Sequence, residues 1–388
     1  MHDPIVYSTF LIFAGAALLA TVALFTRQSM LVSYILVGVL LGPWGLGLIK
    51  EPETISAAAH MGVIFLLFLL GLNLHPQKLL GQLGRAVPVT LISSLLFAMI
   101  GGGVALTFGF GARESLVIAV ASIFSSTIIG LKLLPTTQLH HQHTGEVIIS
   151  ILLLQDFIAI VFLLLLQALG TVDALWWDIG ALMMGLPGLV GVAWLGARYL
   201  MVPLFARFDT VQEYIFLLTI GWCLGFAELA AFLGLSQAIG AFIGGIALAA
   251  SPISTFIAER LKPLRDFFLV MFFFSLGATF DLGTVGEVFP AAVVLAALLL
   301  LAKPSVFGFL LKRAGEDRAL AREVGVRLGQ VSEFSLFIVI LALDSAVIGR
   351  EASYTVQLAT ILTFVVSSYV IMLNYPTPIA VSDRLRRD

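Results

Sequence analysis

Charged residues are scarce in this chain. Asp, Glu, Lys and Arg together make up 11% of its 388 residues, whereas soluble globular domains carry about 25%. A shortfall of this size means that most of the protein surface faces something other than water. The net charge of -2 also gives no basic surface of the kind that binds nucleic acid, so we expect no nucleic-acid partner.

Cysteine is nearly absent as well. Cys223 is the single cysteine, which excludes a disulfide framework and any metal cluster built on cysteine. It lies in an apolar segment, and we interpret it as inert packing. The apolar segments also show no paired nucleophile and base and no metal triad. We therefore expect a protein that is not an enzyme and has no cofactor in this chain.

Long apolar runs are what the chain has in abundance. Hydrophobic residues make up 60% of the sequence, and the mean hydropathy is +1.07. A helix that crosses a bilayer needs about 20 mostly apolar residues. About thirteen segments of this kind cover residues 5–25, 29–49, 55–74, 86–108, 115–134, 145–170, 179–201, 212–231, 234–250, 267–283, 287–311, 324–345 and 354–374. We expect an all-α polytopic membrane protein in the lipid bilayer, with residues 1–388 as a single transmembrane domain and no cytoplasmic regulatory domain in this chain.

The basic residues between these segments predict the orientation. If the N-terminus lies outside, the outside loops hold Lys50, Arg113 and Arg350. All other Lys and Arg residues then fall in inside loops or in the C-terminal tail, apart from Lys303 and Arg327 within predicted spans. Since basic residues favour the cytoplasmic side, we predict an N-terminus outside and a C-terminus inside. Arg327 is near the cytoplasmic start of its span, where its charge can snorkel to the interface.

Asp156 is flanked by apolar residues for about two helical turns on either side, with Gln155 beside it. A charge at the bilayer centre costs about 2.5–3.5 kcal/mol on insertion scales, and such residues mark ion or proton paths. Burial favours the neutral form of a carboxyl group, so a proton can compete with a dehydrated cation. We interpret Asp156 as the shared ligand of a monovalent cation and a proton, with Gln155 adding a carbonyl oxygen. The alternative is an Asp paired permanently with a basic residue that locks the bundle.

Lys303 lies midway along another apolar run and is followed by Pro304, which interrupts helical hydrogen bonding. In a structural role, its amine would bind a carboxylate or a free carbonyl at a helix end. In a functional role, it would pair with Asp156 until a cation releases it. The sequence leaves both interpretations open.

Two spans carry polar interruptions. These are Ser125, Ser126 and Thr127 in the fifth span, and Gln330, Ser332 and Glu333 in the twelfth. Interrupted spans at corresponding places in two halves are the best sequence pointer to a transporter site. Because the two spans are seven apart in order, they run in opposite directions, as inverted repeats require. We predict two discontinuous helices whose free oxygen atoms face the ion, with Glu333 offsetting a half-helix dipole. Ordinary Ser and Thr bonding inside continuous helices is the alternative.

Four further polar residues are weaker candidates. Glu228 lies near the outer end of its span, and we interpret it as a rim residue, with a lining of the outward pathway as the alternative. His140, His141 and His143 cluster in a predicted inside loop. For this cluster a solvated loop is favoured over a pH sensor or a metal site.

These motifs resemble those of the Kef-type potassium/proton exchangers, within the monovalent cation:proton antiporter superfamily. The pair of Gln155 and Asp156 is similar to the Gln-Asp signature of this branch, where sodium-transporting relatives often have Asp-Asp or Asn-Asp. Other similar segments are residues 125–127, 233–242, 272–278 and 329–334, the last with Val331 and Ser332 where the family has two glycines. Residues 257–265 resemble a regulatory loop of the branch.

The resemblance covers nearly the whole chain and implies a fold of thirteen helices with two crossed discontinuous helices. The implied parts are a first repeat at about residues 5–170, a linker helix at about 179–201 and a second repeat at about 212–374. It also implies a homodimer in the bacterial inner membrane, whose core bundle moves like an elevator against a dimerisation scaffold. Members usually carry a cytoplasmic nucleotide-binding domain gated by glutathione, which for this chain would be separate or truncated.

We therefore expect exchange of K⁺ for H⁺, and the resemblance makes Asp156 the ion carboxylate and Lys303 its basic counterpart. Antiport of Na⁺ and H⁺ on the same fold is one alternative, because cavity size and ligand number determine ion choice. A ligand-gated cation channel is the other, although the sequence has no repeated filter-like segment.

Overall fold

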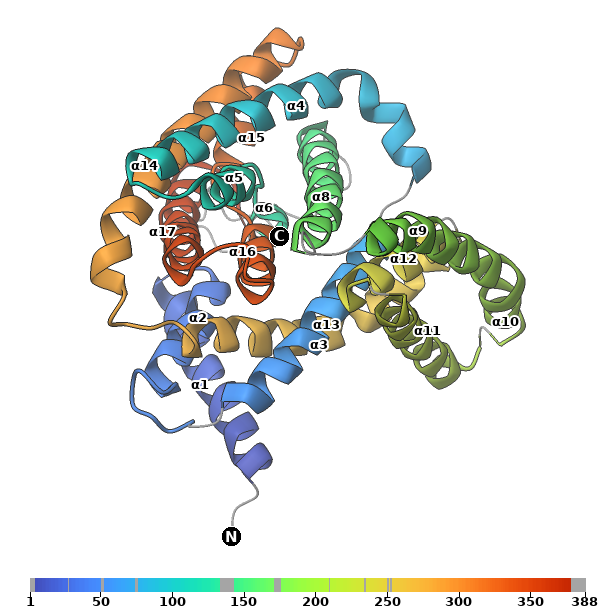
Figure 1. Ribbon diagram of the computed structural model, residues 1–388. Helices are drawn as coiled ribbons and strands as arrows, with labels where there is room; N and C mark the ends of the chain where they lie inside the picture. The colour runs from blue at the N-terminus through green and yellow to red at the C-terminus, as the bar shows by residue number, and fades with distance from the viewer. Residues whose placement is uncertain are drawn as a thin grey trace. The chain divides into compact units, whose positions relative to one another are not determined.

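The computed structural model describes residues 4–377, apart from 27, 50–51, 74–75, 133–142, 171–175, 209, 234, 250 and 252. Every element among the described residues is a helix (Figure 1). Seven of these helices are long and apolar enough to cross a membrane. Each of the predicted segments overlaps one helix or a pair of helices. The number of crossings and the orientation stay predictions.

Internal contacts divide the chain into two compact units. The first unit consists of Met1–Ala14, Val37–Leu80 and Leu164–Thr279, and the second of Gly15–Leu36, Gly81–Leu163 and Phe280–Asp388. Each unit takes segments from both halves of the sequence. The units therefore differ from the predicted repeats and linker, which stay a prediction about internal symmetry.

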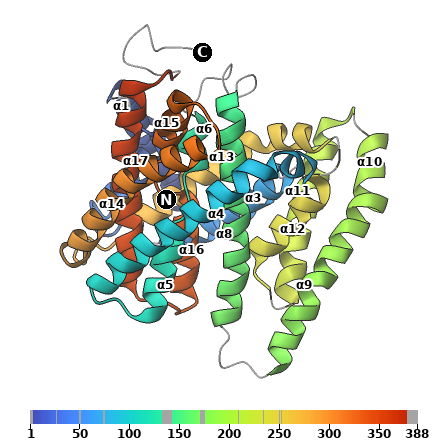
Figure 2. The same ribbon diagram turned by 90° about the horizontal axis from the view of Figure 1, so that it is seen from above.

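The first unit contains the helices between residues 176 and 278, which run from green to orange-yellow in Figure 2. Its helices are α3 (Pro52–Asn73), α9 (Trp176–Gly196), a π-helical turn (Ala197–Met201), α10 (Val202–Arg207), α11 (Gln212–Phe232), α12 (Gln237–Ala249) and α13 (Ser254–Ala278). Helices α1 (Pro4–Thr26) and α2 (Met30–Leu41) are shared between the units. Helix α12 packs on α3, α9 and α11.

Glycine allows the closest of these helix contacts. A Cβ atom at Gly245 of α12 would lie 2.1 Å from the carbonyl oxygen of Phe68 in α3. In the same way, a Cβ atom at Gly71 of α3 would lie 2.4 Å from the carbonyl oxygen of Phe242 in α12. Small residues at such positions let apolar helices approach until their backbones touch, which favours helix association inside a membrane.

The expectation of a loop at residues 257–265 is wrong. Helix α13 begins at Ser254 and runs through Pro263 to Ala278. Ile257 and Leu261 are one helical turn apart and are 0% and 1% exposed. Their burial on one face holds this segment in helical form, although Pro263 lacks the N–H for one helical hydrogen bond.

The second unit carries two interrupted helices. Its helices are α4 (Pro76–Thr107), α5 (Ala112–Ala121), α6 (Thr127–Lys132), α8 (His143–Gly170), α14 (Val285–Arg313), α15 (Arg318–Arg327), α16 (Glu333–Asp344) and α17 (Arg350–Asn374), of which α4 begins and α8 ends in the first unit. Helix α16 packs on α5 and α17, and α14 packs on α15 and α17 (Figure 1). The predicted fifth and twelfth spans are discontinuous, with breaks at residues 122–126 and 328–332.

A serine marks the restart of the helix after each break. The Ser126 hydroxyl accepts a hydrogen bond of 3.0 Å from the N–H of Ile129. The Ser332 hydroxyl accepts one of 3.1 Å from the N–H of Phe334. A serine that takes up a free N–H group in this way favours a helix start. The sequence therefore encodes the ends of the breaks locally.

Candidate functional site

The two helix breaks meet in the second unit. The Ser125 hydroxyl donates a hydrogen bond of 2.9 Å to the carbonyl oxygen of Leu328. The side-chain amide of Gln330 donates one of 3.4 Å to the carbonyl oxygen of Ser126. Non-helical backbone at membrane depth is tolerated only where protein groups or enclosed water satisfy it. Each break therefore supplies partners that the other needs.

The amine of Lys303, in α14, lies between the two breaks and bonds both of them. Lys303 is 0% exposed. The amine donates hydrogen bonds to the carbonyl oxygens of Phe124, of Gln330 at 3.2 Å and of Ile123 at 3.4 Å. These carbonyls follow the C-terminal ends of α5 and α15, where unpaired carbonyls and the helix dipole attract a cation. The ring of Phe97 lies with its centroid 5.3 Å from the amine, a favourable cation–π distance.

These contacts agree with a structural role for Lys303. None of the ion pairs among the described residues includes Lys303, so the predicted pair with Asp156 is not formed in this structure. The amine is instead a cationic bridge between two sets of carbonyl groups. Pairing with Asp156 in another conformation stays a prediction.

Gln155 of α8 holds the first break through both ends of its amide. Its Oε1 accepts a hydrogen bond of 3.0 Å from the N–H of Ser125, and its Nε2 donates one of 3.2 Å to the carbonyl oxygen of Ile123. The residue is 1% exposed. The oxygen that we expected to face the cation is thus engaged by the backbone. Gln155 positions α8 against the break.

Asp156 follows Gln155 on α8 and is 2% exposed. The charge of Glu333 acts directly on it, so the two carboxyl groups belong to one electrostatic site. Glu333 is 4% exposed and is the first residue of α16. The positive end of the helix dipole at this position favours a negative charge, which is the role that we predict for Glu333.

The three predicted hydroxyl groups of the first break differ in what they contact. The Ser125 hydroxyl donates to Leu328, and the Ser126 hydroxyl caps α6. The Thr127 hydroxyl oxygen is buried and has no hydrogen-bond partner in the described part of the chain. Thr127 is the first residue of α6. Its oxygen is therefore the hydroxyl of this group that is available to a ligand.

The second break is held by helix α17 as the first is held by α8. The N–H of Val331 donates a hydrogen bond of 3.1 Å to the hydroxyl of Thr363, in the same position relative to the cap as the N–H of Ser125. Ser367 donates one of 2.9 Å to Oε1 of Gln330. The sequence reasoning missed Thr363 and Ser367. A row of hydroxyl residues at helical spacing on an otherwise apolar helix was the signal that could have found them.

The two breaks differ in the residue that follows their helical hydrogen-bond partner, which is acidic for the first break only. Asp156 follows Gln155, which bonds the first break, whereas Phe364 follows Thr363, which bonds the second. Phe364 is fully buried. Asp156 thus lies within a helix beside the first break, and the second carboxylate, Glu333, is the first residue of α16, directly after the second break.

The remaining candidates do not join this site. Glu228 belongs to the first unit, where its Oε1 accepts a hydrogen bond of 2.7 Å from Nε2 of Gln237; its predicted place at the rim stays a prediction. His140 and His141 lie outside the described residues. His143 begins α8 and contacts carboxylates rather than the breaks.

Arg327 does not snorkel to the interface, and that expectation is wrong. It is 0% exposed. Its Nε donates a hydrogen bond of 2.9 Å to Oε1 of Glu323, and its guanidinium group donates another of 2.9 Å to the carbonyl oxygen of Pro376. Its charge is satisfied inside the protein because α15 and the segment after α17 supply these partners.

The sequence and the fold of this chain can now be compared with those of known proteins. Residues 11–373 match the family described as sodium/hydrogen exchanger, transmembrane. The chain belongs to the sodium/hydrogen exchanger family. It is a multi-pass membrane protein with an all-helical antiporter fold, and a cation:proton antiporter rather than an enzyme. The comparisons identify the family and not a branch within it, so the Kef-type resemblance stays a prediction.

Relatives and solved structures cover nearly the whole exchanger. It is 28% identical over 372 residues to the iron transporter MagA of Paramagnetospirillum magneticum, a match of 95% of this chain and 85% of that protein. Two structures of the sodium proton antiporter MjNhaP1 of Methanocaldococcus jannaschii are similar, with TM-scores of 0.70 and 0.67 at 15% and 16% identity. They cover 94% of this chain and 95% and 94% of those chains. At such identity the likeness shows the fold alone.

Proposed function

We propose that this exchanger moves K⁺ and H⁺ in opposite directions across the bacterial inner membrane, with Asp156 as the ligand that both share. The observation that carries the proposal is a carboxylate that is 2% exposed and acted on by a second buried carboxylate, Glu333. The charge of Asp156 is not stable in such surroundings without a compensating cation or proton. A proton and a dehydrated cation therefore compete for the same oxygen atoms.

The charges around the site favour exchange of one cation for one proton. Asp156 gains one negative charge when it loses its proton. One monovalent cation or one proton neutralises this charge. The free hydroxyl of Thr127 offers a further oxygen ligand, the kind that hard cations prefer.

We propose movement of the elevator type for this exchange. Asp156, Lys303, Glu333 and both helix breaks belong to the second unit. Because every proposed ligand lies in one unit, that unit can carry the cation as a body without taking its ligands apart. Rigid-body movement of one bundle against another is the common basis of alternating access in secondary transporters.

Antiport of Na⁺ and H⁺ is the second candidate, and one observation favours it. The glutamine that distinguishes the potassium branch, Gln155, has both ends of its amide bonded to the first break. The N–H of Ser125 engages its oxygen, which makes Gln155 a weaker direct ligand for the cation in this arrangement. Ion choice then depends on the cavity around Asp156, which the sequence signature does not report.

Flux measurements in proteoliposomes test the proposal. A K⁺ gradient should drive proton movement, and Asp156→Asn should abolish it, because an amide can neither bind the proton nor neutralise the cation. Asp266→Asn is a matched control, since the Asp266 side chain is 47% exposed and paired with Arg265. Undiminished exchange in Asp156→Asn refutes the role of this residue.

Ion competition separates the two candidates. Purified protein should be stabilised against heat by the ion that it transports and by no other, so K⁺, Na⁺ and, in view of the name of the relative MagA, Fe²⁺ are compared in parallel. Stabilisation by Na⁺ alone replaces K⁺ by Na⁺ in the proposal. Loss of the stabilisation in Asp156→Asn assigns the ion to this site.

We also propose, on the basis of the Kef-type resemblance, that the exchanger works as a homodimer, and that a cytoplasmic regulatory domain, where one exists, is separate or truncated. Only the cation and the proton are needed as substrates. Chemical crosslinking in native membranes checks the dimer, and a monomer at all crosslinker concentrations contradicts it.

A further inference from the structure

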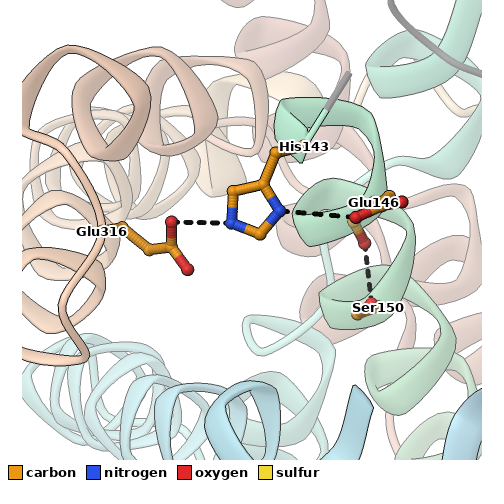
Figure 3. A network of polar contacts seen from close by, with 4 residues as sticks. All are labelled: His143, Glu146, Ser150 and Glu316. Carbon is orange, nitrogen blue, oxygen red and sulfur yellow. Dashed lines mark hydrogen bonds and ion pairs between the residues drawn. The ribbon is translucent and has the colours of Figure 1, made fainter. Parts of the chain in front are cut away.

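His143 contacts two carboxylates, one through each ring nitrogen (Figure 3). Its Nε2 lies 2.9 Å from Oε2 of Glu316, and its Nδ1 lies 3.4 Å from Oε2 of Glu146. His143 and Glu146 belong to α8, whereas Glu316 lies in the turn between α14 and α15. The contact between His143 and Glu316 therefore joins α8, which carries Asp156, to the turn before α15, the helix that ends at the second break.

The geometry makes this contact dependent on a proton. An ionised carboxylate only accepts hydrogen bonds, a neutral imidazole has one N–H group, and an imidazolium has two. Both contacts of His143 are therefore satisfied only when its ring is protonated. In the neutral ring, one bare nitrogen faces a carboxylate oxygen, and their lone pairs repel. An unperturbed histidine changes its charge near about pH 6.5, within the range that cells encounter.

The surroundings of the ring determine which contact matters more. Glu146 from α8 and Glu316 from the turn are the charged groups that act on His143 in the described part of the chain. Glu316 is the closer of the two and is 10% exposed, whereas Glu146 is 62% exposed. A protonated ring at the start of α8 is opposed by the positive end of the helix dipole. It therefore depends on the two carboxylates, of which Glu316 is the one that ties α8 to another part of the fold.

We propose that His143 and Glu316 form a proton-dependent latch that favours the arrangement of α8 in which Asp156 is enclosed. The proposal rests on the proposed function, because it assigns to the latch control over access to Asp156. A contact that exists in one conformation only shifts the equilibrium toward that conformation. Protonation of His143 thus slows exchange, and loss of the proton releases α8. His143 is a positioning residue and does not carry the transported proton.

The test is the pH dependence of exchange in proteoliposomes. Exposed ion pairs change an equilibrium by about two- to five-fold. We expect His143→Gln to exchange about two- to five-fold faster than the wild type at about pH 5.5 and equally fast at about pH 8.5. Glu316→Gln should give the same change, and the double variant no more than either single variant, because the two residues share one interaction. Glu351→Gln is the control, since Glu351 lies exposed in the first turn of α17 and is not among the groups that act on His143.

A second measurement does not depend on transport. Heat unfolding of the purified protein should show the wild type stabilised relative to His143→Gln at about pH 5.5 and not at about pH 8.5. This difference supports the latch even if no variant exchanges ions, a result that would overturn the proposed function instead. Exchange profiles that superimpose for the wild type, His143→Gln and Glu316→Gln overturn the latch and leave antiport at Asp156 intact.

Discussion

Ser125 and Leu328 are 203 residues apart in the sequence, and the hydroxyl of the first donates a hydrogen bond of 2.9 Å to the carbonyl oxygen of the second. Both residues are buried, at 1% and 0% exposure, so water does not replace the bond. It joins the first helix break to the second at the place where Lys303 contacts both. The proposed ion site of this exchanger is therefore an assembly to which both halves of the chain contribute partners.

Removing the amine of Lys303 should destabilise the protein. We expect Lys303→Met to lose about 3 kcal/mol or more, because hydrogen bonds from a charged donor contribute about 1.5–3 kcal/mol each and buried carbonyls are left unpaired. Denaturant or heat unfolding in detergent measures the loss. Lys312→Met is the control, since Lys312 lies exposed in the last turn of the same helix. Equal stability of the two variants would contradict the bridging role.

Ser125→Ala removes the bond to Leu328 together with a contact of 3.4 Å in which the Lys303 amine donates to the same hydroxyl. Ser125→Ala should cost about 1–3 kcal/mol, because the buried carbonyl of Leu328 loses its partner, and exchange should fall with the loss of geometry. Ser305→Ala is matched to it, since the Ser305 hydroxyl is exposed and bonds its own helix at Leu301. A Ser125→Ala protein with the unfolding midpoint of the wild type would show that the breaks do not depend on this contact.

A variant of Gln155 tests whether its amide positions the first break or binds the cation directly. If its amide holds the first break, Gln155→Leu should lower the maximal exchange rate about tenfold or more, since displacement by 1 Å in a catalytic geometry can cost about a hundredfold, while the ratio of K⁺ to Na⁺ affinity stays unchanged. Gln357→Leu is a control, because Gln357 is also buried but bonds Ser353 within α17. A changed affinity ratio would instead identify Gln155 as a cation ligand.

Close helix packing in the first unit is open to a separate test. Gly245→Val should destabilise the protein by about 1–3 kcal/mol, because the added carbon atoms meet the backbone of α3 and overpacking of this kind strains a close contact. Gly221→Val is the matched control in the same unit, since a Cβ atom there meets nothing within 4 Å. Unfolding midpoints that do not differ between these two variants would argue against backbone contact as the basis of this packing.

The extent to which sequence reasoning succeeded depends on the range of the interactions. Apolar runs act through local composition, so the positions of the helices followed from hydropathy. The two breaks followed from serines that cap the next helix turn, as at Ser126 and Ser332. The helix through Pro263 did not follow, because burial of Ile257 and Leu261 by neighbouring helices outweighs the local effect of proline.

The residues of the site also divide into those that local sequence predicts and those that depend on long-range contacts. The sequence by itself determined that this is a helical membrane protein, that Asp156 lies in an apolar span and that two spans are interrupted, because each of these properties depends on neighbours along the chain. Only the tertiary structure decided that Lys303 binds carbonyl groups instead of Asp156, that Gln155 holds a helix break, and that Arg327 is enclosed. Apart from the bond between Arg327 and Glu323, these outcomes depend on partners at least 27 residues away. Such partners are brought together by packing that cannot be deduced from periodicity or composition.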